Sequence, residues 1–531
     1  MSCDRRDLAR VFILALIVRA GMACLIQRPG YMDTAYYASG AVRLAQNGGL
    51  TEPFIWNYLD DPQGLPQPAF LYWMPFPSFL GALPAALFPG SFLALQLPFI
   101  VLSALLPSIT YGISWHMSSS RRLAWIAALL MLFSGFYFPF WTLPETFAPF
   151  AVVGCLALWL TGHSVERWGA VQLGHPENGW GVRTVLLSGV LAGLAHLTRA
   201  DGVLILLVAA LGIGWGVWRS GWRRRGRRAG LLLVYLFAGY SVVMAPWFVR
   251  NISLFGRPLA AGGSRTLWLT TYDDLFAYGA DLSLRSYLAW GWVNILRSKF
   301  WALSVDLERL MAENCLIFLT PFVFLGMYRR RRCAILLLPC VYLVTALLAH
   351  SMAFTFPGPR GGLFHASSAA LPFLMAVGAD GLDSAVRWAA RRRHWRMPQA
   401  QGVFETAAVV GAIALSGYVA AMKVPQWRAA DKNYVQIGEW LAEHTADRPV
   451  VMSGNPPGFW YHTATGGVVV PNGGIEMVLE AADRYGVDFV ILDRNHPGAL
   501  RELYSGEHRH PRLTPLETDA GDARVFSVQP G

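Results

Sequence analysis

Residues 8–37 read LARVFILALIVRAGMACLIQRPGYMDTAYY, and the fold class can be inferred from this stretch. Its first part, residues 8–26, is a mostly apolar run long enough to cross a membrane as a helix. Asp33 follows at once, near the start of a polar stretch of more than forty residues. A carboxylate beside the end of a membrane helix is energetically costly, so its presence there suggests a function. The stretch therefore predicts a membrane protein with chemistry at its outer surface.

The composition of the whole chain supports this class. Of its 531 residues, 54% are hydrophobic and only 15% are charged, and the repeated long apolar runs exclude an ordinary soluble protein. The net charge of +11 is uneven, because residues 425–531 carry −5 and residues 1–424 carry +16. The basic residues fall in short clusters between apolar runs, which is the pattern of cytoplasmic loops. We therefore expect no nucleic-acid partner.

Eleven membrane spans are expected from the apolar runs. They lie at residues 8–26, 92–115, 122–140, 144–162, 184–199, 202–218, 230–248, 310–327, 333–352, 364–381 and 403–421. The basic N-terminus lacks a clear cleavage site after its apolar run, so the first span is expected to be retained. Residues 69–90 are broken by four prolines and are expected to be interfacial or re-entrant.

The basic clusters give the expected orientation. They lie at Arg5, Arg6 and Arg10, at Arg121 and Arg122, and within residues 219–228, 329–332 and 387–396. All fall on one side if the N-terminus is cytoplasmic, and an odd number of spans then places the C-terminus outside. The chain is thus expected to be a multi-pass protein of the plasma (inner) membrane.

Three regions are expected outside the membrane: the loops 27–91 and 249–309, and the tail 425–531. The tail alternates helix-like segments, at 433–444 and 475–485, with short apolar strands at 450–452, 468–470 and 489–492, which predicts a small α/β domain. Residues 1–424 are then the membrane domain. None of the six cysteines lies in the tail or makes a zinc-binding spacing, so they are interpreted as small apolar membrane residues.

Two acidic residues are candidates for chemistry. Asp33 opens the first outer loop, and Glu145 lies in the tight turn between the third and fourth spans, in Trp141-Thr-Leu-Pro-Glu-Thr146. Two such turns at one depth would bring the carboxylates together, either to bind a divalent metal or to position a nucleophile. The alternative is that each carboxylate caps a helix N-terminus.

Several cations are expected on the same side. Arg199 follows the fifth span, where its charge suggests an anionic partner such as a lipid phosphate, although Asp201 offers an intramolecular pair. Arg250 leaves the seventh span at the interface, where it would anchor lipid headgroups or contact a phosphate. Arg360 and His365 lie in a glycine-containing outer loop that would let backbone N–H groups approach an anion, or would simply turn.

The order of these motifs resembles a known family. The motifs are Asp33-x-x-Tyr-Tyr37, Gln67-Pro-Ala-Phe-Leu-Tyr-Trp73, Glu145, Leu197-Thr-Arg-Ala-Asp-Gly202 and Pro246-Trp-Phe-Val-Arg-Asn251 with a later Phe-Gly. Over about residues 8–380, the chain resembles the GT-C glycosyltransferases of the protein O-mannosyltransferase and lipid A aminoarabinose transferase type.

The resemblance implies a polyprenyl-phosphate sugar donor, an active site on the outer face and inversion at the sugar carbon. It implies that Asp33 is the loop carboxylate that acts as base or positions the acceptor, that Glu145 is the second acid, and that Arg199 contacts the donor phosphate. The aminoarabinose branch has a lysine where this chain has Gln67, so that phosphate contact would come from elsewhere, such as Arg360 or Arg250.

The sequence therefore predicts a glycosyltransferase that moves a sugar from a lipid-linked donor to an unidentified acceptor. The alternative is a transporter or flippase. Transporters often carry paired repeats with broken helices at matching positions, and no such repeat is visible in the chain.

Overall fold

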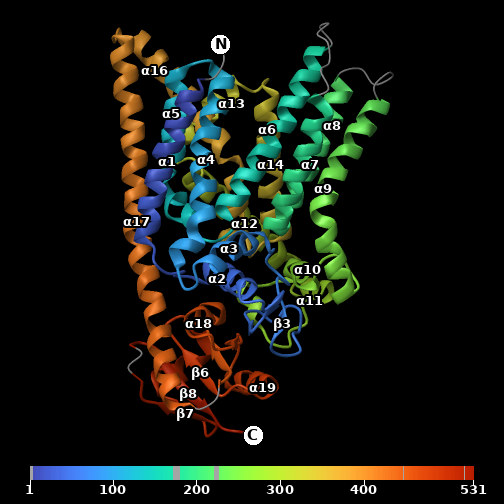
Figure 1. Ribbon diagram of the computed structural model, residues 1–531, viewed down its shortest axis with the longest axis vertical. Coiled ribbons are helices and arrows are strands. Elements are labelled where there is room, and N and C mark those ends of the chain that lie inside the picture. The colour runs from blue at the N-terminus through green and yellow to red at the C-terminus, as the bar shows by residue number, and fades with distance from the viewer. Residues whose placement is uncertain (1–3, 172–179, 220–225, 446–447, 519–520) are drawn as a thin grey trace.

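The computed structural model describes residues 4–171, 180–219, 226–445, 448–518 and 521–531. Long helices form a bundle, and a small α/β domain projects from one end of it (Figure 1). The two termini lie at opposite ends of the long axis (Figure 1). The prediction of an α-helical polytopic membrane protein with a small C-terminal α/β domain is confirmed.

Eight helices among the described residues are long and apolar enough to cross a membrane. They are built on α1 (Arg5–Leu25), α4 (Phe92–Ser118), α6 (Phe147–Val171), α7 (Trp180–Thr198), α9 (Gly226–Phe255), α14 (Ala334–Leu348), α16 (Leu371–Arg393) and α17 (Met397–His444). A ninth span is formed if α5 (Arg121–Leu132) and the 3-10 segment η1 (Gly135–Thr142) count as one element. Helix α8 (Val203–Arg219) is apolar but shorter. The expected count of eleven is thus not confirmed.

The expected span at 310–327 is interrupted. Helix α12 (Trp292–Glu313) ends inside it, and α13 (Thr320–Arg329) begins only after a turn. Leu316 and Ile317 in that turn adopt positive φ values of 53° and 61°, a conformation that a helix cannot contain. Pro321 then removes a backbone donor at the start of α13. The apolar run is therefore split rather than continuous.

The bend of 67° between α5 and η1 is held by contacts from a residue of α1. Arg19 of α1 is completely buried and donates a hydrogen bond of 3.0 Å to the carbonyl of Leu132, the last residue of α5. This bond satisfies a backbone acceptor that the end of the helix leaves free. The guanidinium lies over the rings of Phe138 and Trp141 in η1, which seats the cation inside the bundle.

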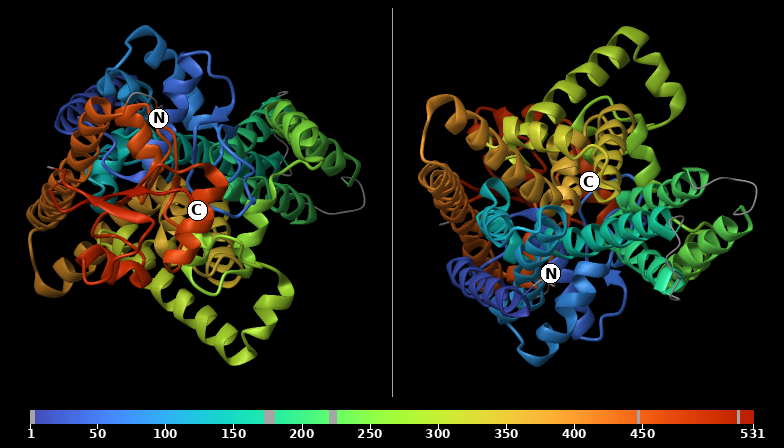
Figure 2. Two further views of the ribbon diagram at one scale, coloured as in Figure 1. Left: turned by 90° about the horizontal axis from the view of Figure 1, so that it is seen from below. Right: turned by 90° about the horizontal axis from the view of Figure 1, so that it is seen from above.

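Short helices cover the end of the bundle nearest the α/β domain (Figure 1). In the first outer loop these are α2 (Met32–Ala45) and α3 (Phe76–Leu87); the latter has twelve residues and is too short to span a membrane. In the second they are α10 (Ala261–Arg265), η5 (Tyr272–Phe276) and α11 (Leu284–Ala289), which the longer helix α12 follows. Figure 2 shows α7–α9 projecting from one side of the bundle and the α10–α12 segment from another. Helix α12 leaves large apolar side chains exposed, among them Trp292, Val293 and Phe300, as an interfacial helix does.

The α/β domain is tied to the bundle by helix and by sheet. Helix α17 has 48 residues, about 72 Å, and so crosses a membrane and continues beyond it. The predicted domain boundary at 424/425 falls inside this continuous helix, and that division remains a prediction.

The domain's sheet has six strands in the order β2-β5-β4-β6-β8-β7, and its first strand belongs to the outer loop 27–91. The strands are β2 (Phe54–Ile55), β4 (Val451–Ser453), β5 (Gly467–Val469), β6 (Phe489–Leu492), β7 (Leu513–Leu516) and β8 (Arg524–Val528). Strands β2, β5, β4 and β6 run parallel to one another. Strand β8 is antiparallel to both of its neighbours, β6 and β7. The domain also contains α18 (Pro456–Thr463), α19 (Ile475–Tyr485) and α20 (Arg501–Ser505). A loop strand at the sheet edge fixes the first outer loop against the domain.

Arginines gather at the end of the bundle where the chain begins. Arg121 pairs with Asp7, Arg122 with Asp383 and Glu405, and Arg330 with Asp380. These pairs show that the basic clusters at the chain start, after α4, after α13 and near the end of α16 share one end of the molecule. In the cluster 219–228, residues 220–225 lie outside the described residues.

Candidate active site

Three of the sequence-predicted residues meet at the end of the bundle that faces the α/β domain. Asp33 lies in the first turn of α2, Glu145 in the turn between η1 and α6, and His365 in α15 (Leu363–Ser367). One ligand atom from each lies within 4.8 Å of the others. Asp33 and His365, which meet here, are more than three hundred positions apart in the chain.

Local structure explains how Asp33 reaches this position. The N-cap of α2 is Tyr31, whose backbone is extended at φ −158°, so the helix begins one residue before Asp33. The Tyr31 hydroxyl donates a hydrogen bond of 2.6 Å to Oε1 of Glu145. Oδ2 of Asp33 lies 3.9 Å from Nε2 of His365. Asp33 therefore lies in the first turn but is not the N-cap, and its carboxylate is turned toward the cluster.

Glu145 is fully buried, and its second oxygen, Oε2, has no hydrogen-bond partner among the described residues. Its first oxygen is bound to the tyrosine hydroxyl rather than to a helix N-terminus. An unsatisfied buried carboxylate oxygen is destabilising unless a proton or a cation occupies it. The capping alternative therefore does not describe this residue.

Two carboxyl groups with different proton affinities result. Desolvation raises the pKa of Asp33 to about 6, and the positive charge of Arg199 opposes the rise. Surrounding protein atoms desolvate the Asp33 carboxylate although 34% of its side chain remains accessible to solvent. Desolvation and the Asp33 charge raise the pKa of Glu145 well above its ordinary value. At neutral pH, Asp33 is therefore ionised, whereas Glu145 binds a proton more tightly than an ordinary glutamate does.

The orientation of His365 is fixed by its neighbours. Its Nδ1 shares a hydrogen bond of 2.8 Å with the hydroxyl of Thr146, and its ring stacks on Phe147 at 3.9 Å between centroids. Nε2 is therefore the nitrogen presented to Asp33. Two carboxylates and one imidazole nitrogen are a donor set that first-row divalent cations accept, and the unpartnered Oε2 of Glu145 fits such an ion.

Arg199 forms the intramolecular pair with Asp201 that the sequence offered as the alternative to a lipid phosphate. Its Nε and Nη2 donate to the two oxygens of Asp201 at 2.9 and 2.7 Å, and Nη2 also contacts the carbonyl of Gly362. His350 completes the pair, with Nε2 at 3.0 Å from Asp201. Only 15% of the Arg199 side chain is exposed. The cation is therefore largely neutralised by its neighbour, because a paired carboxylate competes with any phosphate.

Arg360 is the more accessible cation. Its side chain is exposed, and its guanidinium lies over the ring of Tyr272 at 5.0 Å. Burial raises the pKa of Tyr272 to about 12, with Asp33 adding to the rise and Arg360 opposing it. The charges of Asp33 and Arg360 thus act on the same phenol in opposite directions. The next residue, Gly361, has φ +141°, a conformation that favours glycine and supports the sharp turn expected there.

Arg250 and Gln67 hold the first outer loop instead of facing the cluster. Arg250 donates to the carbonyl of Ala69 at 2.8 Å and lies over Trp247. Gln67 donates to the carbonyl of Phe54 at 2.9 Å within the loop. The expectation that Arg250 contacts a donor phosphate is not supported, because backbone carbonyls already occupy its guanidinium.

Sequence reasoning missed the residues that support the cluster. Tyr31, Thr146 and His350 were not singled out, although each binds a site residue. Tyr37 was quoted only as part of a motif, yet its buried hydroxyl has no hydrogen-bond partner among the described residues. Its spacing of four from Asp33 could have placed it on the same helix face.

Helix α17 braces the segment that leads into the cluster. The carboxylate of Asp431 accepts a 3.0 Å hydrogen bond from the backbone N–H of Gly30, and His462 lies 3.3 Å from the same oxygen. The ring of Trp427 packs against Tyr31 at 5.3 Å between centroids. The position of Asp33 thus depends on residues that the sequence assigned to the exported tail.

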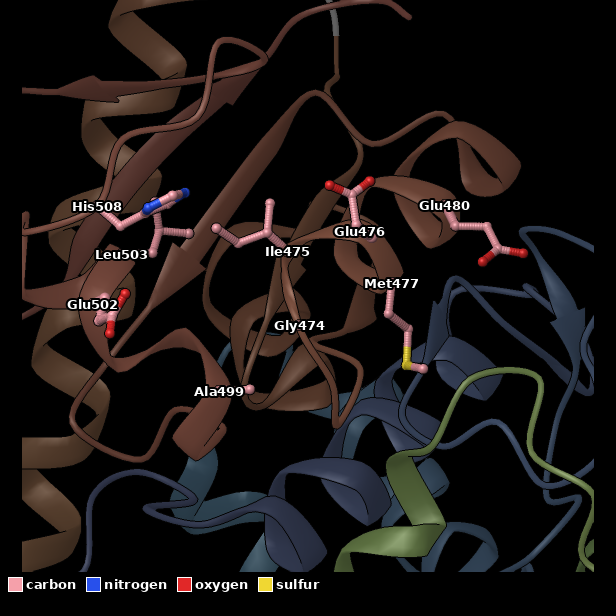
Figure 3. Close-up of a pocket in the computed structure, with 9 residues that line it drawn as sticks. All are labelled: Gly474, Ile475, Glu476, Met477, Glu480, Ala499, Glu502, Leu503 and His508. Atoms are coloured by element: carbon pink, nitrogen blue, oxygen red, sulfur yellow. The ribbon is translucent and has the colours of Figure 1, made fainter.

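A cavity of about 460 Å³ opens on the α/β domain. Figure 3 shows Glu476 and Glu480 on one side of it and Glu502 and His508 on the other. Its polar groups are spread rather than convergent, unlike the three groups beside α2.

The search for similar proteins finds relatives by structure. No protein-family model matches the chain, and no curated protein matches it in sequence. The oligosaccharyltransferase AglB of Archaeoglobus fulgidus, solved with an inhibitory peptide and a dolichol-phosphate, is similar with a TM-score of 0.60 and 14% identity over 94% of this chain and 70% of AglB.

Two further structures share the architecture. ArnT of Cupriavidus metallidurans, bound to undecaprenyl phosphate, has a TM-score of 0.55 and 13% identity over 99% of this chain and 100% of ArnT. The mycobacterial arabinofuranosyltransferase AftD has a TM-score of 0.50 and 13% identity, and the chain covers 40% of its length. At these identities the likeness concerns the fold. The chain has the fold of the GT-C glycosyltransferases, as the resemblance implied.

Proposed function

We propose that this protein is a membrane glycosyltransferase that moves a sugar from a polyprenyl-phosphate donor to an acceptor at the outer face of the membrane. The observation that carries the proposal is the convergence of Asp33, Glu145 and His365 at the bundle end nearest the α/β domain, within a GT-C fold. The similar structures with bound dolichol-phosphate and undecaprenyl phosphate support the class of donor.

The proton of the acceptor would be taken by Asp33. A pKa of about 6 leaves this carboxylate ionised at neutral pH yet basic enough to accept a proton as the acceptor attacks the anomeric carbon. Attack on the face opposite the phosphate inverts the sugar carbon. Glu145, whose pKa is raised by burial, would accept the hydrogen bond of Tyr31 and orient the cluster.

The leaving phosphate would be stabilised mainly by Arg360. The guanidinium is exposed, and no carboxylate is paired with it among the described residues. Arg199 would attract the phosphate through its positive charge but would not form a bidentate contact with it, because Asp201 binds two of its nitrogens. Cations that meet developing charge on a leaving group supply a large share of rate enhancement.

Asp33, Glu145 and His365 would hold a divalent cation, and such an ion, when bound, neutralises charge on the phosphate and orders the carboxylates. The unpartnered Oε2 of Glu145 is the observation that favours this. The transporter alternative gains no support from the similar structures, which are transferases.

Asp33→Asn tests the proposal. The amide keeps the shape but does not take up a proton, so transfer should fall by ~10²–10⁴-fold, the usual size of general-base catalysis. Asp33→Glu should also lose activity, because an extra methylene misplaces the carboxylate. Mass spectrometry of envelope glycans, with and without the gene, would identify the product, and the purified protein would then be assayed for its formation.

The control is Asp61→Asn, which changes a 60% exposed acid in the same outer loop and should leave transfer unchanged. Size-exclusion profiles and thermal midpoints should match for all variants. Full transfer by Asp33→Asn would remove the base from the proposal, and an unchanged glycan profile in the deletion strain would remove the transferase.

A further inference from the structure

A second group of metal-binding side chains lies at the opposite end of the bundle. His116 is near the end of α4, and His163 and Glu166 are on α6. One ligand atom from each lies within 4.8 Å of the others. Cys333, the N-cap of α14, donates from Sγ to Oε1 of Glu166 at 3.5 Å. Four residues of metal-ligand type thus converge from three helices.

The chain places these groups together by regular helix geometry. His163 and Glu166 are three residues apart, so they share one face of α6. Helix α4 packs against α6, and so does α14. The backbone N–H of Ile335 also donates to Glu166 at 3.3 Å, which holds the start of α14 against the carboxylate.

We propose that His116, His163, Glu166 and Cys333 form a zinc site. Two imidazole nitrogens, one carboxylate oxygen and one thiolate sulfur are ligands that Zn²⁺ accepts in tetrahedral sites. The acidic cluster near α2 contains no thiol, so the two groups differ in kind. This inference is independent of the proposed transferase activity.

Distances within the group suit a small cation. Tetrahedral bonds of about 2.0–2.3 Å separate neighbouring ligand atoms by roughly 3.3–3.8 Å. Nε2 of His116 lies 3.4 Å from Oε2 of Glu166, and the thiol lies 3.5 Å from the other oxygen. The ligand atoms of His116, His163 and Glu166 lie within 4.8 Å of one another. Rotation of the two imidazoles and of the Cys333 thiol would bring all four ligand atoms around one ion. The side chain of His116 is 39% exposed, which gives both freedom to rotate and a route for the ion.

Charge also favours a zinc ion here. A thiolate and a carboxylate neutralise Zn²⁺, so the bound site carries no net charge beside the arginines at this end. Arg330 is already paired with Asp380 at 2.7 Å. This end holds the N-terminus and is the one that the basic clusters predict to be cytoplasmic, where thiols remain reduced (Figure 1). A bound ion would clamp α4, α6 and α14 to one another.

Cobalt binding tests the site. The full-length protein, purified in detergent through an affinity tag without histidines and stripped with a chelator, is titrated with Co²⁺. A thiolate ligand should give a sulfur-to-cobalt charge-transfer band in the near ultraviolet, which Zn²⁺ should displace. Cys333→Ser should abolish the band. Cys340→Ser, which removes another thiol from α14, should retain it.

Two more variants separate the possible outcomes. Asp33→Asn should keep the band, because the cluster near α2 has no sulfur ligand. His116→Ala changes a partly exposed residue and should weaken Zn²⁺ binding at least as much as the ~10–100-fold typical of losing an outer-shell partner. Zinc should also raise the thermal midpoint of the native protein but not of His116→Ala. No charge-transfer band, a band that persists in Cys333→Ser, or unchanged zinc affinity in His116→Ala would overturn the site.

Discussion

Buried carboxylates at the two ends of the bundle have opposite surroundings. Where the chain begins, Asp7 receives two hydrogen bonds from Arg121, and Asp383 receives contacts from Arg122, Arg387 and Gln401. Near the α/β domain, Asp33 and Glu145 face each other and a histidine. Their direct contacts are a tyrosine hydroxyl and an imidazole, and among the described residues no guanidinium is bound to either.

The difference separates structural charge from reactive charge. A carboxylate saturated by guanidinium groups is stable as an anion and gains little from another cation. A desolvated carboxylate beside another acid binds protons more tightly, and that property suits proton transfer or metal binding. The Arg199–Asp201 pair is a carboxylate already paired with a guanidinium, although it lies near the unpaired carboxylates. It is therefore expected to organise the site rather than to bind the ligand by itself.

The largest test concerns which end faces the outside. Reporter fusions at Gly226 and at Gly531 should give opposite signals, because the basic end should be cytoplasmic and the α/β domain external. The expected difference is all or none for a pair of reporters active on opposite sides. Matching signals at the two positions would contradict both the predicted orientation and the outer location of the active site.

The two cations provide the next test. Arg360→Ala should reduce transfer by about 10- to 100-fold through loss of a phosphate contact worth ~1.5–3 kcal/mol, with an unchanged thermal midpoint. Arg360→Lys should recover part of the loss, because a point charge remains. Kinetics at varied donor concentration would measure both.

Arg199→Ala is the matched comparison for Arg360→Ala. It should lower the thermal midpoint as well as transfer, because it leaves Asp201 buried beside His350 without its guanidinium. A stable Arg199→Ala variant with poor donor use, together with an unaffected Arg360→Ala variant, would restore Arg199 as the main phosphate ligand.

A smaller effect is expected from pH. Because burial raises the pKa of Asp33 to about 6, its basic form is lost as the pH falls through that value. Transfer should drop about tenfold per pH unit below 6 and level off above about 7. The residual activity of Asp33→Asn should not show this fall in transfer below pH 6. A profile of the native protein that stays flat as the pH falls below 6 would contradict Asp33 as the base.

The sequence predicted the membrane class, several elements and the acidic pair well, for physical reasons. Helix α19 and strand β6 match the predicted segments, because their apolar periodicity is local. The meeting of Asp33 and Glu145 followed from placing two turns at one membrane depth. His365 was proposed for phosphate binding, yet it joins the acidic cluster, since that depends on a turn far along the chain.

Other features were beyond local patterns. The strand that Phe54 and Ile55 add to the sheet pairs with Gly467 and Val468, more than four hundred residues away. The split of the expected span at 310–327 depends on two positive φ values that its apolar side chains do not signal. The group around His163 was missed because His116 and Cys333 come from helices other than α6, so no zinc spacing exists along the chain.

The smallest expected effect is on stability at the arginine-paired end. Arg122 donates to Asp383 at 2.6 Å and also to Glu405, linking α5, α16 and α17. Arg122→Ala leaves Glu405 buried without this partner, but the arginine is 37% exposed, so the loss should be only about 1–2 kcal/mol. The thermal midpoint in detergent should fall, while the kinetics of transfer below that midpoint should match the native protein. Arg391→Ala, an exposed change on α16, should alter neither. If Arg122→Ala lowered transfer without lowering the midpoint, charge at this end would take part in the reaction, and the contrast between the two ends would fail.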